Sequence, residues 1–189
     1  MDIIILNGAS SSGKSSLAKE LQNQLSQPYL HIGIDTFIAM MPDKCNALDG
    51  SKRISDGFYW ASTRQDEQPM LTIQRGAYGH KINQLYRSTV KHFADTGFNV
   101  IVDDVMNGQQ EQAQWQQALE DHQVTYVGVF CDEDVLNERE KNREDRQCGT
   151  AIEQARRVHV GVGYDVTVDT SQSSANECAH RIVLSMQQV

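Results

Sequence analysis

The chain has 189 residues, and its 25 acidic side chains outnumber its 17 lysines and arginines, which gives a formal net charge of −8. This length suits one domain with a core of its own, and the acidic balance argues against a general nucleic-acid-binding protein. No apolar run approaches the roughly 20 residues of a membrane-spanning helix, and the four cysteines stand too far apart for a zinc ribbon. We expect a single soluble, cytoplasmic domain over residues 1–189, without a nucleic-acid or membrane partner.

Short apolar segments alternate with helical patterns along the chain. The apolar segments, each typical of a strand buried on both faces of a sheet, are 3–6, 29–34, 98–102, 124–130 and 166–168. The helical patterns cover 15–25, 78–94, 109–122, 133–143, 151–159 and 174–186. This alternation predicts an α/β fold with a doubly wound parallel sheet and right-handed crossovers.

The connection after the second apolar segment is long for a crossover. Its first part holds Phe37, Ile38, Met40 and Met41, and a polar stretch follows from Asp43 to Gln68. We expect a helical insertion over about residues 36–95. It should lie above the carboxyl ends of the strands, where α/β enzymes bind their substrates.

A phosphate-binding loop follows the first apolar segment. The sequence GASSSGKS, from Gly8 to Ser15, matches G-x-x-x-x-G-K-[ST] at every fixed position, between an apolar strand and a helix. Glycines let backbone N–H groups turn toward a phosphate, Lys14 can reach the β- and γ-phosphates, and the Ser15 hydroxyl can bind Mg²⁺. The alternative is an ordinary turn before a capped helix. We expect the nucleotide to contact Gly8, Ala9, Ser10, Ser11, Ser12, Gly13, Lys14, Ser15 and Ser16.

Two carboxylates end the third apolar segment. Asp103 and Asp104 follow VIV directly, as in the Walker B strand of phosphate-loop proteins. We expect Asp103 to hold Mg²⁺ through water, and Asp104 to support the metal or to reach toward the substrate. Which of the two serves the metal stays open, and so does the alternative that both simply open a loop.

Asp35 is the candidate catalytic base. It follows YLHIGI, so the end of a strand places its carboxylate at the mouth of the sheet, near the expected γ-phosphate. In a kinase this position suits a group that accepts the proton of the attacking hydroxyl and orients its oxygen. The alternative is that Asp35 caps the next helix. No N-K-x-D motif for reading guanine occurs, which argues against a GTPase.

Arginines in the segment NEREKNREDRQCG form a candidate lid. Arg139 and Arg143 lie four residues apart, hence on one helix face, and Arg146 follows them. We expect a lid over about residues 139–150 whose arginines neutralise charge on the transferring phosphate. The alternative is a solvated helix on which neighbouring acidic side chains pair with these arginines.

A short loop follows the last apolar segment and contains Thr170. We expect Thr170 to lie where it can contact the adenine ring. A simple turn that caps the last helix is an equal alternative.

The order of motifs resembles a known family. ILNGASSSGKSS, HIGIDTFIAMMP, VIVDDV, VGVFCD, EREKNREDR and VHVGVGYDVTVDTS together resemble the chloramphenicol phosphotransferases and their relatives, which are small P-loop kinases. The match covers most of residues 1–48 and 76–185. The resemblance implies that Asp35 serves as the base, that ATP and Mg²⁺ are used, and that the sheet has the strand order common to nucleotide kinases. Residues 51–75, in the presumed acceptor pocket, fall outside the match.

We therefore expect an ATP-dependent enzyme that moves the γ-phosphate to a hydroxyl of a small molecule, as chloramphenicol 3-O-phosphotransferase does in antibiotic resistance. Two alternatives stay open. One is a kinase for another hydroxylated metabolite, such as a nucleoside or sugar-like compound, and the other is a non-catalytic ATP-binding regulatory module. The acceptor and the oligomeric state, homo-oligomers included, stay open as well.

Overall fold

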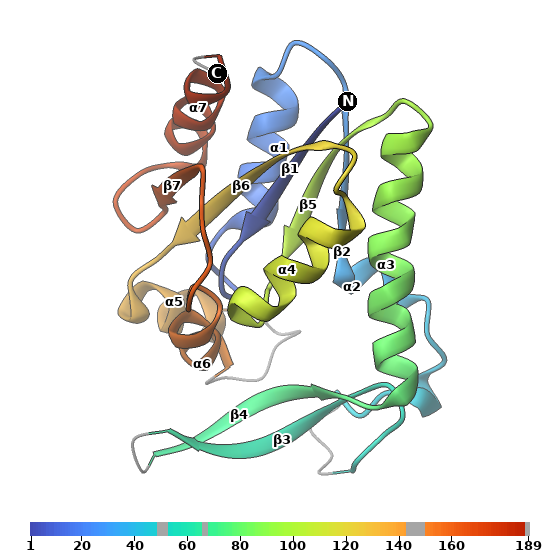
Figure 1. Ribbon diagram of the computed structural model, residues 1–189. Helices are drawn as coiled ribbons and strands as arrows, with labels where there is room; N and C mark the ends of the chain where they lie inside the picture. The colour runs from blue at the N-terminus through green and yellow to red at the C-terminus, as the bar shows by residue number, and fades with distance from the viewer. Residues whose placement is uncertain (49–52, 66–67, 143–149, 188–189) are drawn as a thin grey trace.

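The centre of the molecule is a five-stranded sheet (Figure 1), and the computed structural model describes residues 1–48, 53–65, 68–142 and 150–187. All neighbouring strands in this sheet are parallel, in the order β2-β5-β1-β6-β7. Their bounds are Asp2–Asn7 for β1, Tyr29–Gly33 for β2, Asn99–Asp104 for β5, Gln123–Phe130 for β6 and Val166–Asp169 for β7. The predicted parallel α/β sheet is confirmed.

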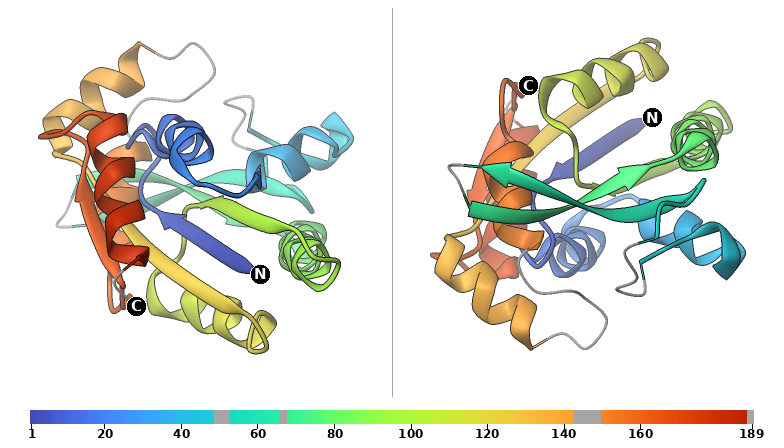
Figure 2. Two further views of the ribbon diagram at one scale, coloured as in Figure 1. Left: turned by 90° about the horizontal axis from the view of Figure 1, so that it is seen from above. Right: turned by 90° about the horizontal axis from the view of Figure 1, so that it is seen from below.

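Helices cover both faces of the sheet (Figure 2). Helices α1 (Lys14–Gln24) and α7 (Ala175–Met186) lie on one face, and α3 (Ala77–Asp95) and α4 (Gly108–Ala118) lie on the other. Alternate residues of β1 pack on opposite faces of the sheet. Ile4 packs on the side of α1, and Ile3 and Ile5 pack on the side of α3. This two-sided burial explains why the strand is apolar at every position from Ile3 to Leu6.

The other helices are short. They are α2 (Ile34–Ala39), α5 (Glu133–Lys141), α6 (Thr150–Arg157) and the 3₁₀ turn η1 (Asp43–Cys45). Every helix predicted from the sequence is present, with ends shifted by a few residues. Of the helices in the described ranges, none combines the length and the apolar character that crossing a membrane requires.

The insertion between β2 and β5 corrects one expectation. It contains α2, η1 and α3, but also an antiparallel hairpin of β3 (Phe58–Gln65) and β4 (Gln68–Arg75), where we expected only helices. Aromatic and β-branched residues recur in both strands, as in FYWAST and LTI, and such residues favour the extended backbone. The hairpin crosses the carboxyl end of the sheet, as the right-hand view of Figure 2 shows.

Asn7 fastens the end of β1 to two other segments. Its buried side chain accepts a hydrogen bond from Met106 N (2.9 Å) and donates to Val158 O (2.8 Å) and to the Tyr164 hydroxyl (2.7 Å). Tyr164 Oη also lies 2.7 Å from His159 Nδ1. Two residues of the motif VHVGVGYD, Val158 and Tyr164, thus accept hydrogen bonds from Asn7, the residue that precedes the phosphate loop.

We predict that Asn7→Ala lowers the free energy of unfolding by at least about 1–3 kcal/mol, because it leaves a buried N–H and a buried carbonyl without partners. Urea unfolding with unchanged m-values measures this loss. Tyr164→Phe is the matched control, since it removes one hydroxyl and leaves the other bonds of Asn7 in place, and its loss should be smaller. Equal stability of Asn7→Ala and wild type would show that the hydrogen bonds of Asn7 do not stabilise the fold.

Candidate active site

The phosphate loop wraps one end of a cavity of about 830 Å³ at the carboxyl edge of the sheet. Ser11 and Gly13 have positive φ angles, 62° and 87°, which turn the loop tightly before α1. At Gly8 a side chain would have no room, since a Cβ atom there would lie 2.5 Å from Val129 O. Gln154 on α6 holds the loop in place, because its Oε1 atom accepts a hydrogen bond from Ser10 N (2.7 Å).

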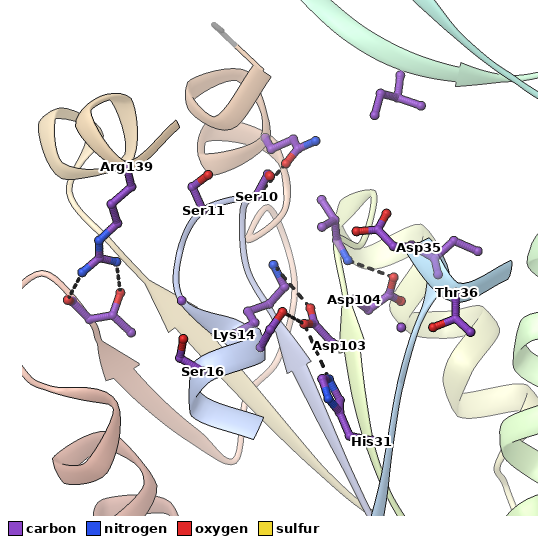
Figure 3. A pocket seen from close by; sticks show the side chains of 18 of the residues that line it. Ser10, Ser11, Lys14, Ser16, His31, Asp35, Thr36, Asp103, Asp104 and Arg139 are labelled. Carbon is purple, nitrogen blue, oxygen red and sulfur yellow. Dashed lines mark hydrogen bonds and ion pairs between the residues drawn. The ribbon is translucent and has the colours of Figure 1, made fainter. Parts of the chain in front are cut away.

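Lys14, Ser15 and Asp103 meet beneath this loop (Figure 3). Lys14 Nζ is buried, donates to Gly8 O (2.9 Å) and Ala9 O (2.8 Å), and lies 3.6 Å from Asp103 Oδ1. Ser15 Oγ donates to Asp103 Oδ2 over 2.7 Å. Parallel register explains the meeting, because Asp103 pairs with Leu6, two residues before the loop begins.

The Asp103 carboxylate is ionised in this setting. Burial opposes its ionisation, but the charge of Lys14, the nearby His31 imidazole and the hydroxyl of Ser15 outweigh burial and hold the pKa of Asp103 at about 2. A hydroxyl and a charged carboxylate are the hard oxygen ligands that Mg²⁺ prefers. Within the described ranges no cluster of three or more acidic, histidine or cysteine side chains surrounds a common point. Ser15 and Asp103 therefore fit a Mg²⁺ ion that takes its other ligands from phosphates and water.

Asp104 has a different environment. It accepts hydrogen bonds from Trp115 Nε1 (2.6 Å) and Val105 N (2.8 Å), on the side of the sheet that α4 covers. Burial, together with the nearby Glu111 carboxylate, raises the pKa of Asp104 to about 6. Successive side chains of a strand point to opposite faces, so only Asp103 faces Ser15. The geometry favours Asp103 over Asp104 as the metal ligand.

Asp35 lies on the wall of the cavity across from the phosphate loop (Figure 3). It occupies the first turn of α2, is exposed, and lines the same cavity as Lys14 and Asp103. Gly33, and not Asp35, is the N-cap residue of α2. Asp35 therefore does not hold the N-cap position of this helix, and it lines the cavity from the first turn.

The far end of the cavity is lined by residues of the insertion. Ile38, Phe58 and Ile73 form an apolar wall, with Arg75 and Asn83 beside them. Arg75 pairs with Glu111, and the amide orientation of Asn83 that satisfies both groups accepts from Arg75 Nη1 over 2.9 Å. Phe58, Ile73 and Arg75 belong to the segment 51–75, which lies outside the motif resemblance, and they contribute side chains to the site.

Arg139 does not lie over the reacting end of the cavity. Its guanidinium donates to Thr170 Oγ1 (3.2 Å) and Thr170 O (2.8 Å), and Thr170 Oγ1 donates to Ser12 O (2.7 Å). This contact joins α5 and the loop after β7 to the flank of the phosphate loop (Figure 3), although β6 separates β7 from β1. Arg143 and Arg146, the other two arginines of the predicted lid, lie outside the described residues.

A comparison with known families identifies the class of protein. Over residues 1–187 the chain matches the family described as chloramphenicol phosphotransferase-like protein. The chain belongs to this family. Two Mycobacterium tuberculosis relatives, "Putative O-phosphotransferase MT2714" of strain CDC 1551 / Oshkosh and "Putative O-phosphotransferase Rv2636" of strain H37Rv, are each 31% identical over 187 residues. Each match covers 98% of this chain and 82% of the relative.

Solved kinase structures share the fold. The Mycobacterium tuberculosis APS kinase CysC, solved with AMPPNP and APS, gives a TM-score of 0.65 at 13% identity over 98% of this chain and 97% of that one. A gluconokinase from Sinorhizobium meliloti 1021 gives 0.59 at 15% identity over 99% and 92%. The predicted P-loop kinase fold and the predicted enzyme class, a phosphotransferase with an alcohol acceptor, are confirmed.

Sequence reasoning missed site residues of this family member that only the fold brings to the cavity. His31 on β2 lines the cavity, and its Nε2 atom lies 3.7 Å from Asp103 Oδ2. Gln154 and Arg75 reach the site from α6 and from the hairpin. The signal for His31 was a polar side chain inside an apolar strand. Of two aromatic residues of the insertion that belong to the core, Phe58 also lines the cavity, whereas Phe37 does not.

The raised pKa of Asp104 predicts a pH dependence of stability. Its pKa is about 6 in the folded chain against an ordinary value of 3.8, so the folded state holds this proton more tightly, and the resulting stabilisation is lost as the pH rises through about 6. Asp104→Asn carries no such proton. We predict that wild type loses stability relative to Asp104→Asn between about pH 4 and about pH 7. Urea unfolding of both proteins across this range measures the difference, and a constant difference would contradict the assignment.

Proposed function

We propose that the protein transfers the γ-phosphate of ATP to a hydroxyl group of a small molecule, and that chloramphenicol and similar alcohols are the first acceptors to test. The observation that carries this proposal is one cavity with the phosphate loop at one end and Asp35 at the other. Ser15 and Asp103 lie between them. A donor phosphate and an acceptor hydroxyl bound in this cavity would approach each other beside Asp35.

Lys14 would provide positive charge at the transferring phosphate. In the structure it bonds to the carbonyls of Gly8 and Ala9, so it is already held within the loop that would surround the phosphates. Mg²⁺ bound by Ser15 and Asp103 would neutralise charge on the phosphate oxygens. Backbone N–H groups at the start of α1 would add donors, since a helix N-terminus favours anions.

Asp35 would act on the acceptor. The hydroxyl oxygen forms a bond to the γ-phosphorus as the bond to the β-phosphate oxygen breaks, and the hydroxyl proton passes to the Asp35 carboxylate. ADP leaves with the charge of the broken bond. Because phosphoryl transfer has a loose transition state, the carboxylate also orients the hydroxyl before its proton leaves.

Arg139 and Thr170 would contact the nucleotide on the base side. They lie on the flank of the phosphate loop away from Asp35, and their mutual hydrogen bonds fix them next to Ser12. This placement supports base or ribose contacts for both residues, including the contact with adenine predicted for Thr170. A role for Arg139 at the transferring phosphate has no support from the geometry.

The acceptor end favours a compact molecule with an apolar part. Ile38, Phe58 and Ile73 would cover that part, and Arg75 with Asn83 would offer hydrogen bonds. This lining suits chloramphenicol-type alcohols, and another hydroxylated metabolite of similar size stays as the second candidate. A regulatory module that only binds ATP would not need Asp35 at an open cavity wall.

The direct test is a transfer assay with ATP labelled at the γ-phosphate and a panel of hydroxylated small molecules that includes chloramphenicol. We predict a phosphorylated product with at least one acceptor. With Lys14→Ala the product should be nearly absent, because loss of this charge raises the free energy of the transition state by several kcal/mol. Wild-type kcat/KM in a folded Lys14→Ala protein would refute the assignment of the loop. Failure of every acceptor, with ATP still bound, would support the regulatory alternative.

We predict that Asp35→Asn binds ATP normally, unfolds at the temperature of wild type, and transfers phosphate about 10²–10⁴-fold more slowly, since asparagine cannot take the proton. Steady-state rates at saturating ATP and acceptor measure the loss. Asp43→Asn is the matched control, because Asp43 is an exposed carboxylate just beyond α2 that does not line the cavity. Unchanged kcat in Asp35→Asn would show that this carboxylate is not the base.

A further inference from the structure

His31 has a buried nitrogen without a hydrogen-bond partner. Its Nε2 atom is closed off from solvent and makes no hydrogen bond within the described ranges. Asp103 Oδ2 is 3.7 Å away, which is longer than a hydrogen bond. A buried polar atom without a partner is unfavourable. A small movement of either side chain would bring His31 Nε2 within hydrogen-bond distance of Asp103 Oδ2.

The sheet explains why the imidazole reaches Asp103. Gly33 pairs with Asp103 in the register of β2 and β5, and His31 is two residues earlier on the same face of β2. Gly33 has no side chain, and a Cβ atom there would already lie 3.5 Å from the Cβ atom of Asp103. The space next to the carboxylate is therefore left to the side chain of His31, which leans along the strand.

Lys14 and His31 approach Asp103 from different sides (Figure 3). Lys14 Nζ is nearer Oδ1, on the side of the phosphate loop, and His31 Nε2 is nearer Oδ2. Ser15 Oγ donates to the same Oδ2. Bound phosphates would draw Lys14 toward themselves. Asp103 would then keep Ser15 as a donor, and a small approach of His31 Nε2 would add a second one.

We propose that His31 is a positioning residue for the metal-binding carboxylate. When nucleotide and a divalent ion are bound, His31 Nε2–H donates to Asp103 Oδ2 and holds the carboxylate toward the phosphate loop. This inference rests on the proposed function, in which Asp103 serves the metal. Carboxylates that bind metals are themselves held by hydrogen bonds, and loss of such a donor typically costs about 10–100-fold in metal affinity.

The test compares binding of a fluorescent ADP analogue in Mg²⁺ and in EDTA, so that the ratio of the two dissociation constants reports the contribution of the metal. We expect His31→Leu, which keeps bulk but no donor, to reduce this ratio by about 10–100-fold while the affinity in EDTA stays unchanged. His31→Gln retains an N–H donor and should recover most of the ratio. His31→Ala replaces the leucine variant if that protein does not fold.

His180→Ala is the matched control, since His180 is an exposed histidine on α7 that does not line the cavity. A wild-type ratio in His31→Leu would overturn the inference alone. A loss that also appears in EDTA, or that His31→Gln fails to recover, would overturn it too, because it would show a structural role. The absence of any metal effect in wild type would instead refute the metal site of the proposed function.

Discussion

The pairing of β1 with β5 and of β5 with β2 is the constraint on which the site depends. Parallel strands end at one edge, and their register places Leu6 and Gly33 on either side of Asp103. The phosphate loop continues from β1, and α2 begins directly after β2. Each therefore starts within two residues of the position that pairs with Asp103. Asn7 secures the arrangement, since it ties the end of β1 to the loop after β5 and to the turn after α6. Backbone pairing therefore sets the positions of the phosphate loop and of Asp35 across the cavity.

The neighbouring carboxylates Asp103 and Asp104 show how strand geometry separates chemical roles. Asp103 is held ionised by Lys14 and Ser15, whereas Asp104 is buried against Trp115 and has a raised pKa. Asp104 also belongs to a chain of polar contacts that leads away from the nucleotide. Glu111 lies close enough to raise its pKa and at the same time pairs with Arg75 of the hairpin. The strand that carries Asp103, the proposed metal ligand, thus also contacts the network that holds Arg75 of the hairpin through its other face.

Local patterns in the sequence were enough to predict the sheet, the main helices and the phosphate loop, because each of these is specified by residues close together in the chain. Two kinds of feature were not accessible. The hairpin was not predicted, because the polar stretch from Asp43 to Gln68 favoured a helical insertion, although aromatic and β-branched residues recur in 58–75. His31 and Gln154 needed the register between strands and the packing of α6, which involve separations of 72 and 144 residues to Asp103 and Ser10. The position of Arg139 depended on a hydrogen bond to Thr170 that no helix pattern contains.

The division between sheet and insertion bears on how acceptors are distinguished. Among the described residues, those proposed to act on the phosphates, Lys14, Ser15 and Asp103, come from α1 and the edge of the sheet. Phe58, Ile73 and Arg75 come from the hairpin. In the antiparallel register Phe58 pairs with Arg75 and Trp60 pairs with Ile73, so the lining residues occupy the end of the hairpin next to α3. Arg75 is held there by Glu111 of α4 and faces the same cavity as Asp35. Under the proposed function, substitutions of a few residues at the hairpin base would change which acceptors bind, while the phosphate loop and Asp103 would keep their positions.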